Sequence, residues 1–224
     1  MESEMLDSEA AEVAAMLPAG SRVAIIGSNS YWHAASEETC AALGRSLARL
    51  NRLVLVTGGV SGVAEGVGRS FCSAREGLGR QADVFHLLPR GSWRCDYGET
   101  VRAGSDMSER REILGRVAEV YVMVEGGPGT AHEASVARAR SATVIPVGQS
   151  GGHAAVLYPQ VLRPSSVPEH FWRTLGNADV SPERVVDAIV EIVRACVLEL
   201  KHGVQRSGQP DGPVDHRPCE DHRV

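Results

Sequence analysis

Short apolar runs alternate with helix-like patterns along most of this chain. The runs at 22–27, 53–57, 83–88, 120–124 and 143–147 predict strands that are buried in a parallel sheet. Between them, residues 35–50, 63 to about 76, 106–116 and 130–140 show helical spacing. Regular alternation with short connections predicts an α/β fold, an open and mostly parallel sheet with helices on both faces.

The organisation along the chain is a leader at 1–20, a single domain at 21–202 and a tail at 203–224. Residues 90–105 look irregular, and residues 157–180 look like a packed loop or short helices. Ser181-Pro182-Glu183 is typical of a helix start. The apolar stripe that follows, up to Lys201, predicts a terminal helix that packs on the sheet or serves as a dimer interface. From Gly203 onward the composition predicts disorder.

Composition and charge exclude several classes of function. The chain has 224 residues, and its net charge of −5 predicts neither nucleic acid nor an anionic membrane as a partner. No apolar run approaches the roughly 18 residues that a membrane-spanning helix needs. The N-terminus, Met1-Glu2-Ser3-Glu4, is acidic, which does not suit a signal or transit peptide. We therefore expect a cytoplasmic protein.

Lysines, cysteines and histidines argue against common cofactors. Lys201 is the only lysine, so the chain has no P-loop and no suitable Schiff-base lysine for pyridoxal phosphate. The five cysteines are widely spaced without a Cys-x-x-Cys pair. In the tail, His216, Cys219 and His222 could bind a metal, but a disordered polar tail is the favoured interpretation. The sequence predicts no cofactor and no metal site.

Glycines follow three of the predicted strands. Gly27-Ser28 ends the first, Gly58-Gly59-Val60-Ser61-Gly62 the second, and Gly126-Gly127-Pro128-Gly129-Thr130 the fourth. Glycine lets the backbone approach a ligand, and a following helix directs free N–H groups at an anion. Tight turns also need glycine, but two such loops in one sheet favour an anion or nucleotide site. Thr130 can cap its helix or bind a phosphate oxygen.

Charged residues accompany the glycine-rich loop at 126–130. Asp106-Met107-Ser108-Glu109-Arg110-Arg111 opens the helix before that loop, and Glu133 lies in the first turn of the helix after it. Adjacent arginines face different sides of a helix, so at most one is expected to point inward, and Arg111 suits a solvated surface. Glu133 can be a structural acid favoured by the helix dipole. An acid beside an anion site is costly, however, which favours a functional role.

These segments resemble the LOG ("lonely guy") family, often mislabelled lysine decarboxylase. Its signature is Met-x-x-Arg-Lys followed by Pro-Gly-Gly-x-Gly-Thr-x-x-Glu, and the similarity covers roughly residues 20–150. The resemblance implies a Rossmann-like fold, a homodimer, and a phosphoribohydrolase that cleaves nucleoside 5′-monophosphates of the cytokinin riboside or AMP type. It implies Arg110 and Glu133 as the catalytic pair. The implied ligand-binding residues are Gly27, Ser28, Gly58, Gly59, Gly62, Met107, Arg111, Gly126, Gly127, Pro128, Gly129 and Thr130.

Two positions depart from the signature: Glu125 replaces proline and Arg111 replaces lysine. The family's acidic substrate contact has no clear counterpart, although Asp96 lies nearby in sequence. A Glu125 carboxylate could pair with Arg102 or Arg138, contact ribose hydroxyls, or indicate a ligand that carries no phosphate at this loop.

Three functions are compatible with the sequence. The first is an N-glycosidase that acts on a small-molecule nucleotide, with Glu133 stabilising the oxocarbenium character on the ribose. The second is a non-catalytic binding protein for a phosphate-bearing cofactor, such as the related molybdenum-cofactor carriers. A nucleotide-sensing module within a larger assembly is a third. The sequence does not distinguish the preferred base.

Overall fold

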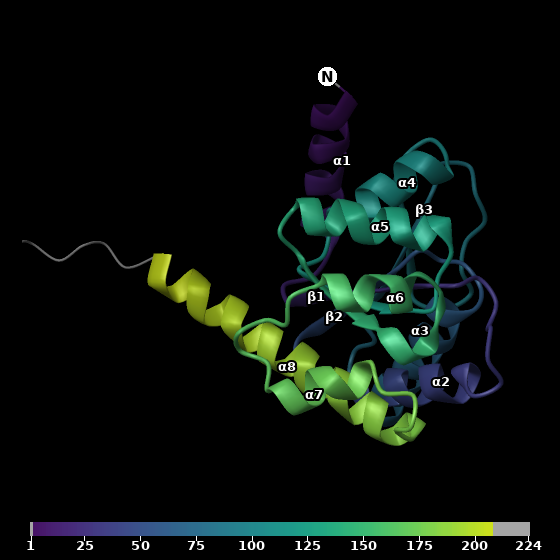
Figure 1. The fold of residues 1–224 in the computed structure, drawn as a ribbon. Helices are drawn as coiled ribbons and strands as arrows, with labels where there is room; N and C mark the ends of the chain where they lie inside the picture. Colours follow the sequence, from purple (N-terminus) through teal and green to yellow (C-terminus); the bar gives the residue numbers. More distant parts are fainter. Residues whose placement is uncertain (1, 208–224) are drawn as a thin grey trace, which may run out of the picture.

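The structure is a computed structural model that describes the backbone of residues 2–207 and the side chains of residues 3–200. Its centre is a single sheet (Figure 1). The strands are β1 (Ser21–Gly27), β2 (Leu53–Thr57), β3 (Val84–Leu88), β4 (Glu99–Arg102), β5 (Val120–Val124) and β6 (Thr143–Val147). Their order across the sheet is β4-β3-β2-β1-β5-β6, and each neighbouring pair is parallel. The predicted α/β fold with a parallel sheet is confirmed.

The edge strand β4 was not predicted, because its segment reads as irregular. Glu99 is exposed, Thr100 and Arg102 are half-buried, and Val101 alone has a buried side chain. An edge strand is covered on one side only, so it does not need the continuous apolar run that identifies its neighbours. Backbone pairing with β3 holds it in place.

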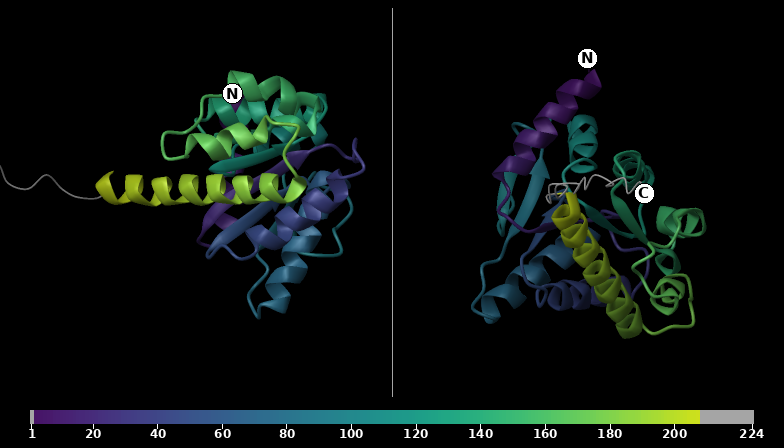
Figure 2. Two further views of the ribbon diagram at one scale, coloured as in Figure 1. Left: turned by 60° about the horizontal axis from the view of Figure 1, so that its bottom comes forward. Right: turned by 90° about the vertical axis from the view of Figure 1, so that its left-hand side faces the viewer.

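Helices cover both faces of the sheet (Figure 2). They are α1 (Glu2–Met16), α2 (Ser36–Leu47), α3 (Val63–Gly77), α4 (Met107–Leu114), α5 (Pro128–Ala139), α6 (Gly152–Leu157), α7 (Glu169–Leu175) and α8 (Pro182–Ser207), with short 3-10 turns at Gly148–Ser150 and Tyr158–Gln160. The region at 157–180 therefore contains the short helical elements that its sequence predicts.

Alternate residues of each strand enter two separate cores. In β1, Val23 and Ile25 join a core with α2, α3, α7 and α8, whereas Ala24 and Ile26 join a core with α1, α4, α5 and α6. This alternation follows from the period of two in a strand. The terminal helix packs on the first core through its predicted stripe, which includes Ile189 and Val193.

Both ends of the described chain contain helix. The predicted leader forms α1, which buries Ala10 and Val13 in the second core and pairs Asp7 with Arg116. At the other end α8 continues to Ser207, past the predicted limit at Lys201, and its far end extends beyond the sheet (Figures 1 and 2). Residues 208–224 lie outside the described residues. Within the described part, no helix is long and apolar enough to cross a bilayer.

Candidate functional site

A cavity of about 260 Å³ lies beside the carboxyl ends of β1 and β5. The chain builds outward from β1 to β4 and then returns to the other side of β1 with β5 and β6. This is the switch in strand order where open α/β sheets bind ligands. The lining residues are Ile25, Ile26, Gly27, Ser28, Asn29, Trp32, Gly58, Val60, Ala64, Met107, Arg110, Arg111, Leu114, Gly127, Pro128, Gly129, Thr130 and Glu133.

Most of the sequence-predicted site residues meet in this cavity. Gly59, Gly62 and Gly126 do not line it, and all three have positive φ angles. Gly62 precedes α3, where a Cβ would lie 2.3 Å from the Ser28 carbonyl oxygen. These three glycines shape the loops, while their neighbours face the cavity.

Helix α5 begins at the cavity wall. Gly127 is its N-cap and Pro128 occupies the first turn, and the Ala131 N–H makes a 3.0 Å bond to the Gly127 carbonyl. The N–H groups of Gly129 and Thr130 precede that bond, in the position where helices contact anions. The Thr130 hydroxyl donates to the Gly27 carbonyl at 2.9 Å. Its proton therefore joins β1 to α5, a use that differs from both of the predicted ones.

Helix α4 is positioned by its N-cap. The Asp106 carboxylate accepts hydrogen bonds from the N–H groups of Ser108 at 2.7 Å and Glu109 at 2.9 Å. This is the capping pattern that begins a helix in a defined orientation. It directs Arg110 into the protein, where only 3% of its surface is exposed.

Arg110 and Glu133 form a buried ion pair. Arg110 Nη1 donates to Glu133 Oε1 at 2.6 Å, and Glu133 is only 6% exposed. Among the described residues, the hydrogen bonds of the Glu133 carboxylate involve Oε1 alone, and Arg110 Nε is buried with no hydrogen-bond partner. Both residues line the cavity, and Glu133 keeps Oε2 without a hydrogen bond to the described residues.

Burial changes the pKa values of both partners. It raises the pKa of the Glu133 carboxyl above its ordinary value, although the charge of Arg110 acts in the opposite direction. It lowers the pKa of the Arg110 guanidinium, which the charge of Glu133 opposes. Arginine nevertheless stays protonated in proteins, so the positive charge of the pair is fixed.

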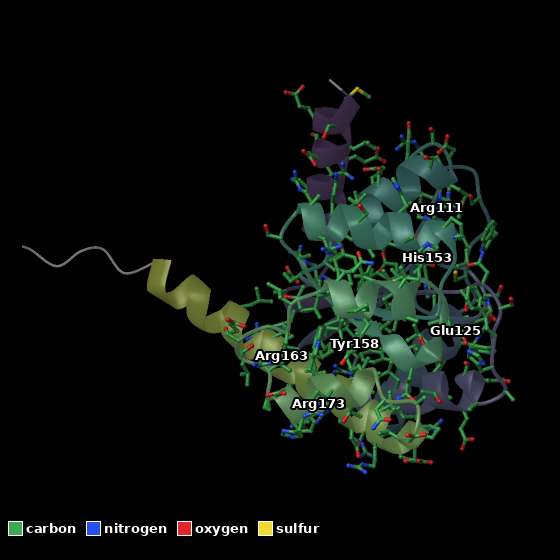
Figure 3. All side chains as sticks on the ribbon, viewed as in Figure 1. Arg111, Glu125, His153, Tyr158, Arg163 and Arg173 are labelled. Atoms are coloured by element: carbon green, nitrogen blue, oxygen red, sulfur yellow. The ribbon has the colours of Figure 1, made fainter. Side chains whose placement is uncertain are left out.

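Arg111 also lines the cavity, where its side chain is half-buried, whereas Arg110 is buried. A Cβ at Gly129 would lie 3.0 Å from Arg111 Nε, so the side chain lies over the first turn of α5. The cavity extends around the side of α4, and two successive positions can reach it. In Figure 3, Arg111, His153 and Glu125 lie toward the same side of the molecule, away from Arg163 and Arg173.

Glu125 is fully buried and does not line the cavity. Its carboxylate accepts hydrogen bonds from the hydroxyls of Ser28 and Ser36 and from the N–H of Trp32, the last at 3.1 Å. Its backbone has a φ of 56°, in the left-handed region that few glutamates adopt. The carboxylate thus holds the loop between β1 and α2.

The ion pair considered for Glu125 is not formed. Arg102 instead donates from Nη1 to the carbonyls of Pro89 and Trp93, both at 3.1 Å. Arg138 lines a different cavity beside β6 and α8. Two hydroxyls and one backbone N–H therefore satisfy the Glu125 carboxylate in place of an arginine. No motif spacing in the sequence predicts these contacts.

Trp32 is the principal lining residue that sequence reasoning missed. It stands in an irregular loop, where no periodicity identifies a role. The available signal was an aromatic residue shortly after a strand that ends in glycine. Asp96, by contrast, lies on a neighbouring cavity and pairs with Arg69 at 2.6 Å.

Residues 21–167 match the SLOG cluster4 family. This chain belongs to that family. The match confirms the resemblance to LOG proteins at the level of the SLOG superfamily, and leaves the phosphoribohydrolase assignment to the proposal below. Among proteins with curated descriptions, none matches the chain.

Solved structures share this fold. The protein TM1055 is 26% identical to this SLOG chain, with a TM-score of 0.57 over 78% of this chain and 98% of that one. The molybdenum cofactor binding protein from Rippkaea orientalis is 18% identical, with a TM-score of 0.53 and the same coverage. At these identities the second likeness concerns the fold alone.

The expectation that nucleic acid is not a partner does not stand, because it goes further than the charge of the chain allows. DNA processing protein A from Helicobacter pylori is 13% identical, with a TM-score of 0.47 over 76% of this chain and 80% of that one, and its structure describes single-stranded DNA binding. The expectation was drawn from a net charge of −5. A charge summed over the chain does not describe a local surface, so it does not exclude such a partner.

Proposed function

We propose that the cavity binds a nucleoside 5′-monophosphate of the AMP or cytokinin riboside type. We propose further that the protein hydrolyses its N-glycosidic bond to the free base and ribose 5-phosphate. The buried Arg110–Glu133 pair carries the proposal, because it places a carboxylate beside an anion-binding helix start.

The phosphate would lie at the first turn of α5. The N–H groups of Gly129 and Thr130 would contact its oxygens, and Arg111 would add a positive charge at the same turn. Gly127 leaves the entrance clear, since a Cβ there would meet no atom within 4 Å. This end of the cavity would anchor the substrate by its charge.

The chemistry would take place at the anomeric carbon. As the C1′–N bond breaks, the base leaves with the electron pair and takes a proton from solvent, while positive charge develops on the ribose. The free Oε2 of Glu133 would stabilise that charge and accept the proton of the water that attacks C1′. Arg110, through Glu133 Oε1, would act as a positioning residue that fixes the direction of the carboxylate.

A second candidate is a non-catalytic carrier of a phosphate-bearing cofactor such as molybdenum cofactor. The observation that favours it is the ion pair itself, since a carboxylate that already pairs with a buried arginine is less available to a charge that develops on the ligand. The molybdenum cofactor binding protein named above has the same fold. A carrier would hold its ligand without turnover.

Product analysis separates the two candidates. The protein is incubated with AMP, and chromatography detects free adenine and ribose 5-phosphate. We expect both products in equal amounts, their loss in Glu133→Gln, and no change in the matched control Glu38→Gln, which alters an exposed glutamate on α2. AMP or riboside monophosphates that bind without turnover would support a binding role, and absence of their binding would overturn the hydrolase.

The homodimer implied by the LOG resemblance stays a prediction. Static light scattering of the full chain after size-exclusion chromatography tests it, with twice the monomer mass of 23.9 kDa as the expected result.

A further inference from the structure

Trp32 presents a large apolar ring at the mouth of the site. Its side chain lines the cavity although the residue is 49% exposed. A half-exposed indole that lines a cavity can stack on a flat aromatic ring. The same cavity contains the helix start of α5, so one ligand can reach both features.

The ring is supported from behind. A Cβ at Gly152 would lie 2.5 Å from Cζ3 of Trp32, and the same Cβ would lie 2.8 Å from the Gly126 carbonyl oxygen. Gly152 has a φ of 58°, which a side chain would disfavour further. The start of α6 therefore packs closely against the indole, beside the glycine-rich loop.

Glu125 fixes the loop that carries the ring. Its carboxylate receives donors from the start, middle and end of the loop, namely Ser28, the Trp32 N–H and Ser36. Its own backbone is held from the other side, because its N–H donates to Ser150 Oγ at 2.7 Å and its carbonyl accepts from Ala154 N at 3.0 Å. A buried acceptor satisfied by three donors rigidifies its surroundings.

We propose that Trp32 is the stacking platform for the planar base of the ligand and that Glu125 is the positioning residue that holds it there. This inference rests on the proposed function and adds the residue that recognises the base. It gives the departure from the LOG signature at position 125 a role in holding the residue that contacts the base.

The test compares two ligands by calorimetry. One is a C-nucleoside 5′-monophosphate, whose carbon–carbon bond between base and ribose resists hydrolysis, and the other is ribose 5-phosphate, which lacks the base. Trp32→Ala should weaken nucleotide binding about 5- to 150-fold, the equivalent of the 1–3 kcal/mol typical of base stacking. Ribose 5-phosphate should bind unchanged. Trp32→Phe, which keeps an aromatic face, should retain most of the affinity.

Matched variants separate stacking from general effects. Trp93 is 55% exposed and lines the neighbouring cavity, so Trp93→Ala should leave both affinities unchanged. Glu125→Gln should lower the preference for the nucleotide while ribose 5-phosphate binds as before, because an amide N–H faces donors that a carboxylate accepts. If that variant does not fold, Ser36→Ala removes one of the three donors and should lower the preference in the same direction.

The outcomes are distinguishable. If the wild type prefers the nucleotide and Trp32→Ala keeps that preference, the platform is overturned while the proposed function stands. If Trp32→Ala loses the preference and neither Glu125→Gln nor Ser36→Ala does, the positioning role of Glu125 is overturned. If the wild type binds neither ligand, the proposed function fails and this inference fails with it.

Discussion

The Arg110 guanidinium lies directly over Gly58: a Cβ at position 58 would be 2.7 Å from Nη1 and 3.2 Å from Cζ of that side chain. The glycine after β2 therefore leaves the space in which the arginine reaches Glu133. Any side chain at position 58 would collide with Arg110, which explains the glycine there. The backbone conformation does not require glycine, because Gly58 has no positive φ.

Replacing Gly58 tests this relationship. Gly58→Ala should displace the guanidinium, lower the free energy of unfolding by about 1–3 kcal/mol, and reduce AMP hydrolysis with it. Gly77→Ala is the matched control, because a Cβ at this helical position would meet nothing within 4 Å. Urea denaturation of both variants measures the difference. Equal stability of Gly58→Ala and the wild type would show that Arg110 moves aside freely.

The buried pair should behave as a unit in a double-mutant cycle. Arg110→Met leaves the Glu133 carboxylate buried without its partner, and we expect a loss of about 3–5 kcal/mol in the free energy of unfolding. The double variant Arg110→Met/Glu133→Leu removes both charges and should recover much of that loss. Additive losses, measured by urea denaturation, would show that the two side chains are not coupled.

The raised pKa of Glu133 gives opposite pH dependences to activity and stability. Hydrolysis needs the carboxylate, so kcat/KM should fall with acid through a pKa above the 4.5 ordinary for glutamate. Because the folded-state pKa exceeds the unfolded one, the native state binds more protons between the two values. The free energy of unfolding should therefore decrease as pH rises through that window. The difference between wild type and Glu133→Gln isolates this contribution, and a pH-independent difference would contradict it.

The sequence predicted what depends on local pattern and missed what depends on distant contacts. Five strands were identified because each is a continuous apolar run, whereas β4 was hidden by the polar residues Glu99 and Arg102 at the sheet edge. Arg110 and Glu133 were predicted from the resemblance to the LOG signature. Trp32 and Glu125 are 93 positions apart, and their hydrogen bond leaves no periodic trace in either segment.

The sequence also did not predict the hydrogen-bond partner of the Thr130 hydroxyl. Its sequence position suited either a helix cap or a phosphate ligand, and the structure directs its proton to the Gly27 carbonyl. Thr130→Val removes that donor with almost no change of shape and leaves the carbonyl of the half-buried Gly27 without this partner. We expect a loss of about 0.5–1.5 kcal/mol in the free energy of unfolding.

The affinity for ribose 5-phosphate decides what the Thr130 hydroxyl does for a ligand. Since the backbone N–H groups of Gly129 and Thr130 survive in Thr130→Val, calorimetry should find nearly unchanged binding of ribose 5-phosphate. Thr130→Ser, which keeps a hydroxyl able to reach Gly27, should restore stability and bind equally well. If Thr130→Val abolished the binding of ribose 5-phosphate and Thr130→Ser restored it, the hydroxyl would be a direct contact of the phosphate. In that case the bond between β1 and α5 would have to open when the ligand enters, because one proton cannot serve both acceptors.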